Sequence, residues 1–427
     1  MTPASAAIVR NYAAVTGAYW ADTLADGAIR TLILFNFYQL GYTPFQVASL
    51  FLFYEVFGVL TNLFGGYLGA RLGLKTTLFL GLGTQLTALS MLGFGSPAWL
   101  TVPYVMASQA LSGIAKDLTK MSSKSAVKLV AGSSESRLYK WVALLTGSKN
   151  ALKGVGFFFG ALLLSLWGFQ KSVLVLAGVV LTGLLFALLV LRGGLGTANK
   201  KARFSQMFSH NRAVNILAAA RLFLFGARDV WFTVGLPVFL ASVLGWAFWQ
   251  AGAFMALWVI GYGAVQAATP ALKIRKSGAA QREPDGRTAL WLALVLALVP
   301  AAIALSLHFR VAPAHAVTSG LIVFGVVFAL NSAVHSYLIL AYTESDKVAL
   351  NVGFYYMANA GGRLAGTVLS GLLYQMGVAS GLHGGLIWCL WASTAFVVLA
   401  ALLSLFLPVG QIRRAGPPVL GALDAPE

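Results

Sequence analysis

Long apolar segments recur along almost the whole chain, separated by short stretches of turn residues or basic residues. A bilayer core of about 30 Å requires roughly 20 apolar residues in a helix. By this criterion the pattern predicts twelve membrane-spanning helices, at residues 12–38, 45–70, 75–95, 100–123, 138–166, 172–191, 213–243, 249–271, 288–308, 314–342, 348–376 and 384–407. The expected fold class is an all-α polytopic membrane protein.

The composition supports a membrane protein and limits the kinds of partner expected for it. Of 427 residues, 59% are hydrophobic and only 10% are charged, whereas soluble domains carry about 25% charged residues. The lipid bilayer is therefore the expected environment. The net charge of +18 does not indicate a nucleic-acid partner, because so little soluble sequence is present. A single Arg10 precedes a long first helix with polar residues, unlike a secretory signal peptide, so we expect this helix to be retained.

The basic residues outside the spans are distributed very unevenly. Twenty of the 30 Lys and Arg residues lie in alternate loops and at the two ends, and the opposite loops hold only Lys171 and Arg310. Basic loops stay in the cytoplasm, so this asymmetry predicts that both termini are cytoplasmic. It also supports an even number of spans.

The chain divides into two halves of six spans. We expect an N-terminal bundle at 1–191, a basic cytoplasmic linker at 192–212, a C-terminal bundle at 213–408 and a tail at 409–427. Parallel repeats of six helices are the plan of the major facilitator superfamily, which the chain resembles in this respect. In that fold the third helix of each triplet is peripheral, and spans 3, 6, 9 and 12 here have no charged residue in their interiors. A monomer is the expected state.

Thirteen charged residues lie inside the predicted spans. Charge within a membrane is costly, usually faces a cavity, and marks function. The eight bases are Arg30, Lys116, Lys120, Lys149, Lys153, Arg221, Arg228 and Arg363, and the five acids are Asp22, Asp26, Glu55, Asp117 and Asp229. This surplus of bases predicts a cavity that binds a small anion, and the planar fork of arginine suits phosphate and carboxylate.

Helical spacing adds neutral residues to the predicted site. Residues three or four apart share a helix face, which places Asn331, His335, Tyr355 and Asn359 among the candidate substrate contacts. Each candidate has a structural alternative: Arg228 could brace the two halves, Lys120 could extend to the interface, and His335 could be a packing histidine rather than a proton carrier. Adjacent residues on a helix point about 100° apart, so we expect the neighbours Arg228-Asp229 and Lys116-Asp117 to pair with other helices.

Four of the acids are candidates for proton coupling, which needs a carboxyl that can protonate within the membrane. They are Asp22, Asp26, Glu55 and Asp229. The alternative is that Asp26 and Glu55 only neutralise Arg30. The single cysteine, Cys389, and five scattered histidines have no metal-ligand spacing, so no metal or cofactor is expected. No deep nucleophile–base pair is evident, so an enzyme is not expected.

Between spans 2 and 3 the chain reads GYLGARLGLK, from Gly66 to Lys75. This resembles the signature loop of the major facilitator superfamily, G-x-L-x-D-R-x-G-R-K, in which Gly66, Arg71, Gly73 and Lys75 match and form the expected gating loop. In the family the acid of this motif helps hold the two halves in one state. Ala70 occupies that position here, so the holding contact is either absent or formed by other residues.

Four longer segments narrow the resemblance. Residues 51–66, 110–129, 141–158 and 221–246 are similar to the organoarsenical efflux permeases of the ArsJ type, and the likeness extends from about residue 10 to 376. It implies export of 1-arseno-3-phosphoglycerate across the bacterial inner membrane, with glyceraldehyde-3-phosphate dehydrogenase as the functional partner that makes the ester from arsenate. The alternative is an organophosphate or other organic-anion permease of the same fold. Proton antiport, exchange and uniport all remain open as driving forces.

Overall fold

The computed structural model describes residues 3–131, 135–191, 211–269, 284–343 and 348–409, and within them the only regular secondary structure is helical. The helices are α1 (Pro3–Gln39), α2 (Pro44–Leu50), α3 (Leu52–Leu72), α4 (Leu74–Phe94), the short 3₁₀ helix η1 (Pro97–Trp99), α5 (Val102–Ala131), α6 (Glu135–Val190), α7 (Arg212–Phe232), α8 (Gly235–Ser242), α9 (Phe248–Ala268), α10 (Gly286–His308), α11 (Pro313–Ala341), α12 (Val348–Val378) and α13 (Gly384–Ser404). Every predicted span coincides with a helix, part of a helix or two consecutive helices.

The helices and the predicted spans do not correspond one to one at three places. Span 2 consists of α2 and α3, and span 7 consists of α7 and α8. Spans 5 and 6 lie within α6, separated by Gly168, whose φ of 72° is accessible to glycine at little cost. At the break in span 7, the Ser370 hydroxyl oxygen accepts hydrogen bonds from the backbone amides of Val234 and Gly235, at 3.1 and 3.0 Å. An interrupted helix is tolerated in a membrane when its freed backbone groups find such partners.

By length and hydropathy alone, eight helical stretches of the described residues qualify as membrane spans. The long helices that fall outside this set are α1, α5 and α12. These three carry charged residues such as Asp26, Lys116 and Arg363, which lower their mean hydropathy. The chain is a multi-pass membrane protein in which the least apolar helices are central ones.

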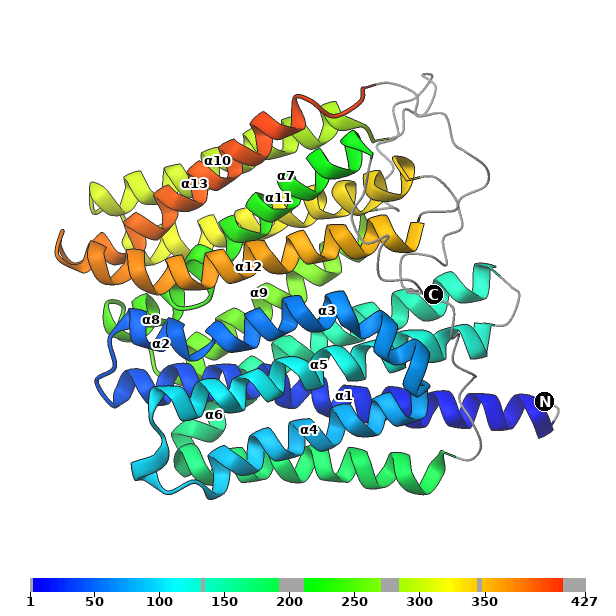
Figure 1. The fold of residues 1–427 in the computed structure, drawn as a ribbon. Coiled ribbons are helices and arrows are strands. Elements are labelled where there is room, and N and C mark those ends of the chain that lie inside the picture. The colour runs from blue at the N-terminus through cyan, green and yellow to red at the C-terminus, as the bar shows by residue number, and fades with distance from the viewer. Residues whose placement is uncertain (1–2, 132–134, 192–210, 270–283, 344–347, 410–427) are drawn as a thin grey trace.

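The helices form two bundles (Figure 1). Helices α1 to α6 make up the N-terminal bundle and α7 to α13 the C-terminal bundle, and α12 lies beside α3 where they meet. Helix α1 begins and α13 ends at the same end of the molecule. Helices α4, α10, α13 and the second part of α6 expose large apolar side chains, including Leu80, Leu298, Leu402 and Leu189. Such exposure agrees with the peripheral position expected for spans 3, 6, 9 and 12, although α9 and α11 also expose large apolar side chains, including Leu257 and Ile322.

The two bundles contact each other closely at the end of the molecule away from the start of α1. Phe35 of α1 stacks on Phe248 of α9 with ring centroids 4.7 Å apart. The Phe45 backbone amide donates a hydrogen bond to Gln375 Oε1 of α12 at 3.2 Å. Gly371 lets α2 approach α12, because a Cβ there would lie 2.5 Å from the Pro44 carbonyl oxygen. We call the two contacts between α2 and α12, those of Phe45 and of Gly371, the α2–α12 closure.

The predicted gating loop lies only partly within the described residues. Gly66 and Arg71 fall on α3, where side chains are outside the described set. Gly73 has a φ of 79° between α3 and α4, and Lys75 Nζ donates to the Leu191 carbonyl oxygen at 3.4 Å, within the N-terminal bundle. The predicted linker, except for Asn211 and Arg212, and the predicted tail, except for its first residue, also lie outside the described residues.

Candidate functional site

A cavity of about 300 Å³ lies between the two bundles. It is lined by nine of the twelve predicted substrate contacts: Arg30, Lys116, Lys120, Lys149, Lys153, Arg221, Arg228, Asn359 and Arg363. Asn331, His335 and Tyr355 are buried and do not line it. No described residue of α4, α10, α13 or the second part of α6 contributes to the wall, so the cavity is built by the helices that carry polar stripes.

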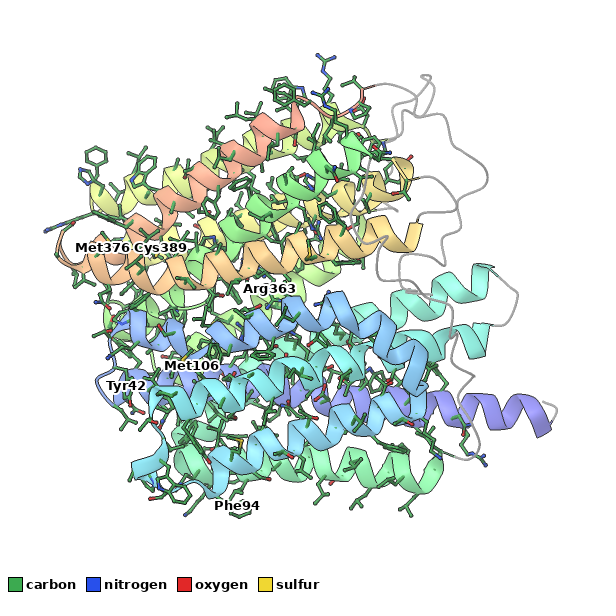
Figure 2. All side chains as sticks on the ribbon, in the orientation of Figure 1. Tyr42, Phe94, Met106, Arg363, Met376 and Cys389 are labelled. Carbon is green, nitrogen blue, oxygen red and sulfur yellow. The ribbon has the colours of Figure 1, made fainter. Side chains whose placement is uncertain are left out.

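Five charged residues form a continuous series of ion pairs, here called the arginine chain. It consists of Arg30, Glu55, Arg363, Asp229 and Arg228. Glu55 Oε1 accepts from Arg30 at 3.0 Å and from Arg363 at 2.8 Å. Arg363 Nε also lies 3.3 Å from Asp229 Oδ2, and Arg228 lies 2.5 Å from Asp229 Oδ1. Glu55 belongs to the N-terminal bundle and Arg363 to the C-terminal bundle, so the arginine chain joins the two bundles. Figure 2 shows Arg363 where the two bundles meet.

The expectation that sequence neighbours avoid pairing is wrong. Arg228 Nε donates to Asp229 Oδ1 at 2.6 Å, and Lys116 Nζ lies 3.9 Å from Asp117 Oδ2. The long, flexible stems of arginine and lysine span the angle between adjacent helix positions. Each of the two acids nevertheless has a second basic partner, Arg363 for Asp229 and Lys120 for Asp117.

A second group, here called the lysine cluster, lies on α5 and α3 and consists of Lys116, Asp117, Lys120 and Asn62. Lys120 Nζ is 3.5 Å from Asp117 Oδ1 and donates to Asn62 Oδ1 at 3.1 Å. The Asn62 amide donates in turn to Asp117 Oδ2 at 3.2 Å. Lys116 Nζ lies 4.2 Å from the centroid of the Tyr54 ring, a distance at which cation and ring attract each other. Both lysines line the cavity.

Asp26 pairs with Lys153 and not with Arg30. Lys153 Nζ lies 3.2 Å from Asp26 Oδ2, and the Tyr54 hydroxyl donates to Asp26 Oδ1 at 2.5 Å. Of the two acids considered as partners of Arg30, Glu55 contacts it directly, whereas the ion pair of Asp26 is with Lys153. Tyr54 was missed by sequence reasoning because one aromatic residue within an apolar span carries no distinguishing pattern.

Asp22 lies apart from the cavity. It is 1% exposed and its Oδ2 accepts from the Thr119 hydroxyl of α5 at 2.6 Å. Asp26, Glu55 and Asp229 do line the cavity, and proton coupling at any of the four acids stays a prediction.

The cavity wall also includes Tyr262 and Gln266 of α9. Sequence reasoning missed these two residues, although their four-residue spacing forms a detectable polar stripe on span 8.

Removing the Tyr54 hydroxyl should destabilise the N-terminal bundle. Tyr54→Phe leaves Asp26 Oδ1 buried without its donor, and a lost hydrogen bond to a charged group costs about 1.5–3 kcal/mol. We expect a lower thermal unfolding midpoint in detergent. Tyr38→Phe on the same bundle is the matched control, since the Tyr38 hydroxyl has no hydrogen bond among the described residues. Equal midpoints for the two variants would contradict the assigned role of Tyr54.

The balance of charge around the cavity is positive. Eight bases line it against four acids, Asp26, Glu55, Asp117 and Asp229, among the described residues. Both the arginine chain and the lysine cluster contain more bases than acids. A negatively charged ligand can therefore enter either group without displacing every existing partner.

Two helical bundles that enclose a charged cavity at their seam define the class of alternating-access membrane transporters. The sequence profile of the Major Facilitator Superfamily matches residues 15–338. The chain belongs to this superfamily, and the predicted fold is confirmed. The fold is similar to the crystal structure of a mutant of the nucleoside transporter NupG, with a TM-score of 0.68 and 15% identity over 92% of this chain and 99% of that one. No curated protein matches the sequence.

Proposed function

We propose that this transporter exports a small organic polyanion, and that its substrate is the arsenylated phosphate ester 1-arseno-3-phosphoglycerate. The observation that carries the proposal is the lining of the cavity, with eight bases against four acids. Three of these bases are arginines of the arginine chain, whose planar guanidinium groups bind phosphate and carboxylate through paired hydrogen bonds. The resemblance to organoarsenical permeases supports the particular ester.

The arginine chain also supports a link between binding and movement. Arg363 is held by Glu55 of one bundle and by Asp229 of its own bundle. An oxyanion that takes over Arg363 competes with both carboxylates, and the ion pair between the bundles weakens as the anion binds. A ligand shifts a conformational equilibrium only through such a difference in interactions between the states.

The chemistry of the ester fits the donors that line the cavity. It has a phosphate at one end and an arsenate ester at the other, so it offers hard oxygen acceptors at both ends. A cavity of about 300 Å³ lies at the lower limit of ligand pockets and suits a small substrate. A transporter for trivalent arsenic would use soft thiolates, but the only cysteine, Cys389, is buried on α13 outside the cavity wall.

Reconstituted arsenate export tests the proposal. Cells that express the protein with glyceraldehyde-3-phosphate dehydrogenase should gain arsenate tolerance and release the ester, whereas either protein alone should not confer this. Unchanged tolerance with both proteins present would contradict the proposed substrate. The alternative, an organophosphate permease, would instead show uptake of sugar phosphates into everted vesicles. Repeating the uptake with and without an imposed pH gradient reports whether protons drive transport.

A further inference from the structure

Arg221 differs from the other cavity arginines because no carboxylate neutralises it. Arg228 and Arg363 both contact Asp229, and Arg30 contacts Glu55. Arg221 has no ion pair with any described residue, although it is only 4% exposed. The hydrogen-bond acceptors of its guanidinium group are neutral: Nη1 donates to the carbonyl oxygen and the hydroxyl oxygen of Ser332, at 3.1 and 3.0 Å.

Two aromatic rings also contact the guanidinium group of Arg221. Its Cζ atom lies 4.0 Å from the Phe225 ring centroid and 4.9 Å from that of Tyr355. These cation–π contacts orient the group and stabilise its charge in part, but they supply no opposite charge. Nε has no hydrogen-bond partner. A buried charge without an opposite charge is costly and normally marks a function. Arg221 is such a charge, because it forms no ion pair with any described residue.

The surroundings of Arg221 supply further polar groups. Tyr262 Oη and Gln266 Nε2 approach Ser332 Oγ at 3.3 and 3.4 Å, and both residues line the cavity together with Arg221. Contacts to Ser332 therefore bring the cavity-lining side chains of Arg221, Tyr262 and Gln266 to one part of the wall. There an anionic ligand could reach both the guanidinium charge and two polar groups.

Arg221 and Arg228 lie seven residues apart on α7, which places them about 10 Å apart along one helix face. The arginine chain and the Arg221 site are thus two positive positions in one cavity, separated by two helical turns. Only the first contains its own carboxylates.

We propose that the cavity-lining side chains of Arg221, Tyr262 and Gln266, held in place by the buried Ser332, form a second oxyanion subsite. This subsite receives one anionic end of a substrate whose other end binds at the arginine chain. The inference rests on the proposed function and deepens it: the cavity selects small molecules with an oxyanion at each end of a short carbon chain. Molecules with one anionic group leave the Arg221 charge uncompensated and bind less tightly.

A comparison of two stable probes tests this selection. 3-Phosphoglycerate has two anionic ends, and glycerol 3-phosphate has one. Titration calorimetry on the purified full-length protein should show that the wild type binds 3-phosphoglycerate about tenfold more tightly, the value of one charge-assisted hydrogen-bonded contact. Arg221→Gln should bring this ratio close to one while changing the affinity for glycerol 3-phosphate by about twofold or less.

Three further variants separate charge, geometry and folding. Arg212→Gln is the matched control, because Arg212 is an exposed arginine at the start of the same helix and lies outside the cavity wall; it should keep the wild-type ratio. Arg221→Lys should keep part of the preference. If Arg221→Gln does not fold, Gln266→Leu takes its place, and a reduction in the ratio of about threefold is expected for one neutral donor.

Three outcomes are decisive. A ratio near one in Arg221→Gln or a reduced ratio in Gln266→Leu supports the subsite. An unchanged ratio in these variants, or equal weakening of both probes, overturns it. If the wild type binds neither probe, the proposed substrate class fails, and the subsite is then judged by inorganic phosphate. Phosphate should raise the thermal midpoint of the wild type and Arg212→Gln by more than that of Arg221→Gln, which retains only the arginine chain, and equal responses overturn the subsite.

Discussion

Arg363→Ala should abolish transport while the protein remains folded in the membrane. Arg363 is the described residue whose side chain pairs with acids of both bundles, at 2.8 Å from Glu55 and 3.3 Å from Asp229. Removing one partner of a buried ion pair costs about 3–5 kcal/mol, and here it removes both the contact between bundles and a cation of the proposed anion site. We expect a loss of vesicle transport of about 100-fold or more.

Two variants sharpen this result. Arg287→Ala removes an exposed arginine from the first turn of α10, outside the cavity, and should transport normally. Arg363→Lys keeps the charge but presents a single ammonium group in place of the fork, so it should retain part of the activity. Wild-type transport by Arg363→Ala at equal membrane abundance would show that the central anion site lies elsewhere.

The sequence could predict which helices carry the site but not how its charges pair. Hydropathy and the distribution of basic residues give the spans, and the buried charges of spans 1, 2, 4, 5, 7 and 11 mark the cavity helices. Pairing depends on how side chains from different helices meet. Glu55 contacts Arg363 across 308 residues of sequence, and no periodicity along one helix contains that information.

Side-chain length caused the clearest errors. A helical wheel places the Cβ atoms of Arg228 and Asp229 about 100° apart, yet the arginine side chain is long enough to return to its neighbour. Helical spacing also fails for Asp22, which lies four residues before the cavity-lining Asp26 but accepts a hydrogen bond from Thr119 of α5 and stays outside the cavity wall. The partner that a neighbouring helix offers therefore decides where a charged side chain lies.

Gly371→Ala should shift the transporter away from the state seen here. A Cβ at Gly371 would lie 2.5 Å from the Pro44 carbonyl oxygen and still closer to the Ala48 side chain, so α2 and α12 would have to separate. Overpacking of this kind typically costs about 1–3 kcal/mol. Only the closed arrangement of these helices bears this cost, so the equilibrium should move about 5- to 150-fold toward the state open at this end.

Gly361→Ala is the matched control for the α2–α12 closure. It makes the same substitution on the same helix, with the same gain in helix propensity, but its Cβ would meet only Leu222 Cδ1 at an ordinary 3.8 Å. Val47 of α2 is fully buried here, so labelling of a cysteine introduced by Val47→Cys reports opening. The native Cys389 contributes little background because it is buried. Gly371→Ala should label faster and transport more slowly, and Gly361→Ala should match the parent. Equal labelling of both variants would mean that the Gly371 contact does not separate during transport, and the closure would then be a fixed hinge between the bundles.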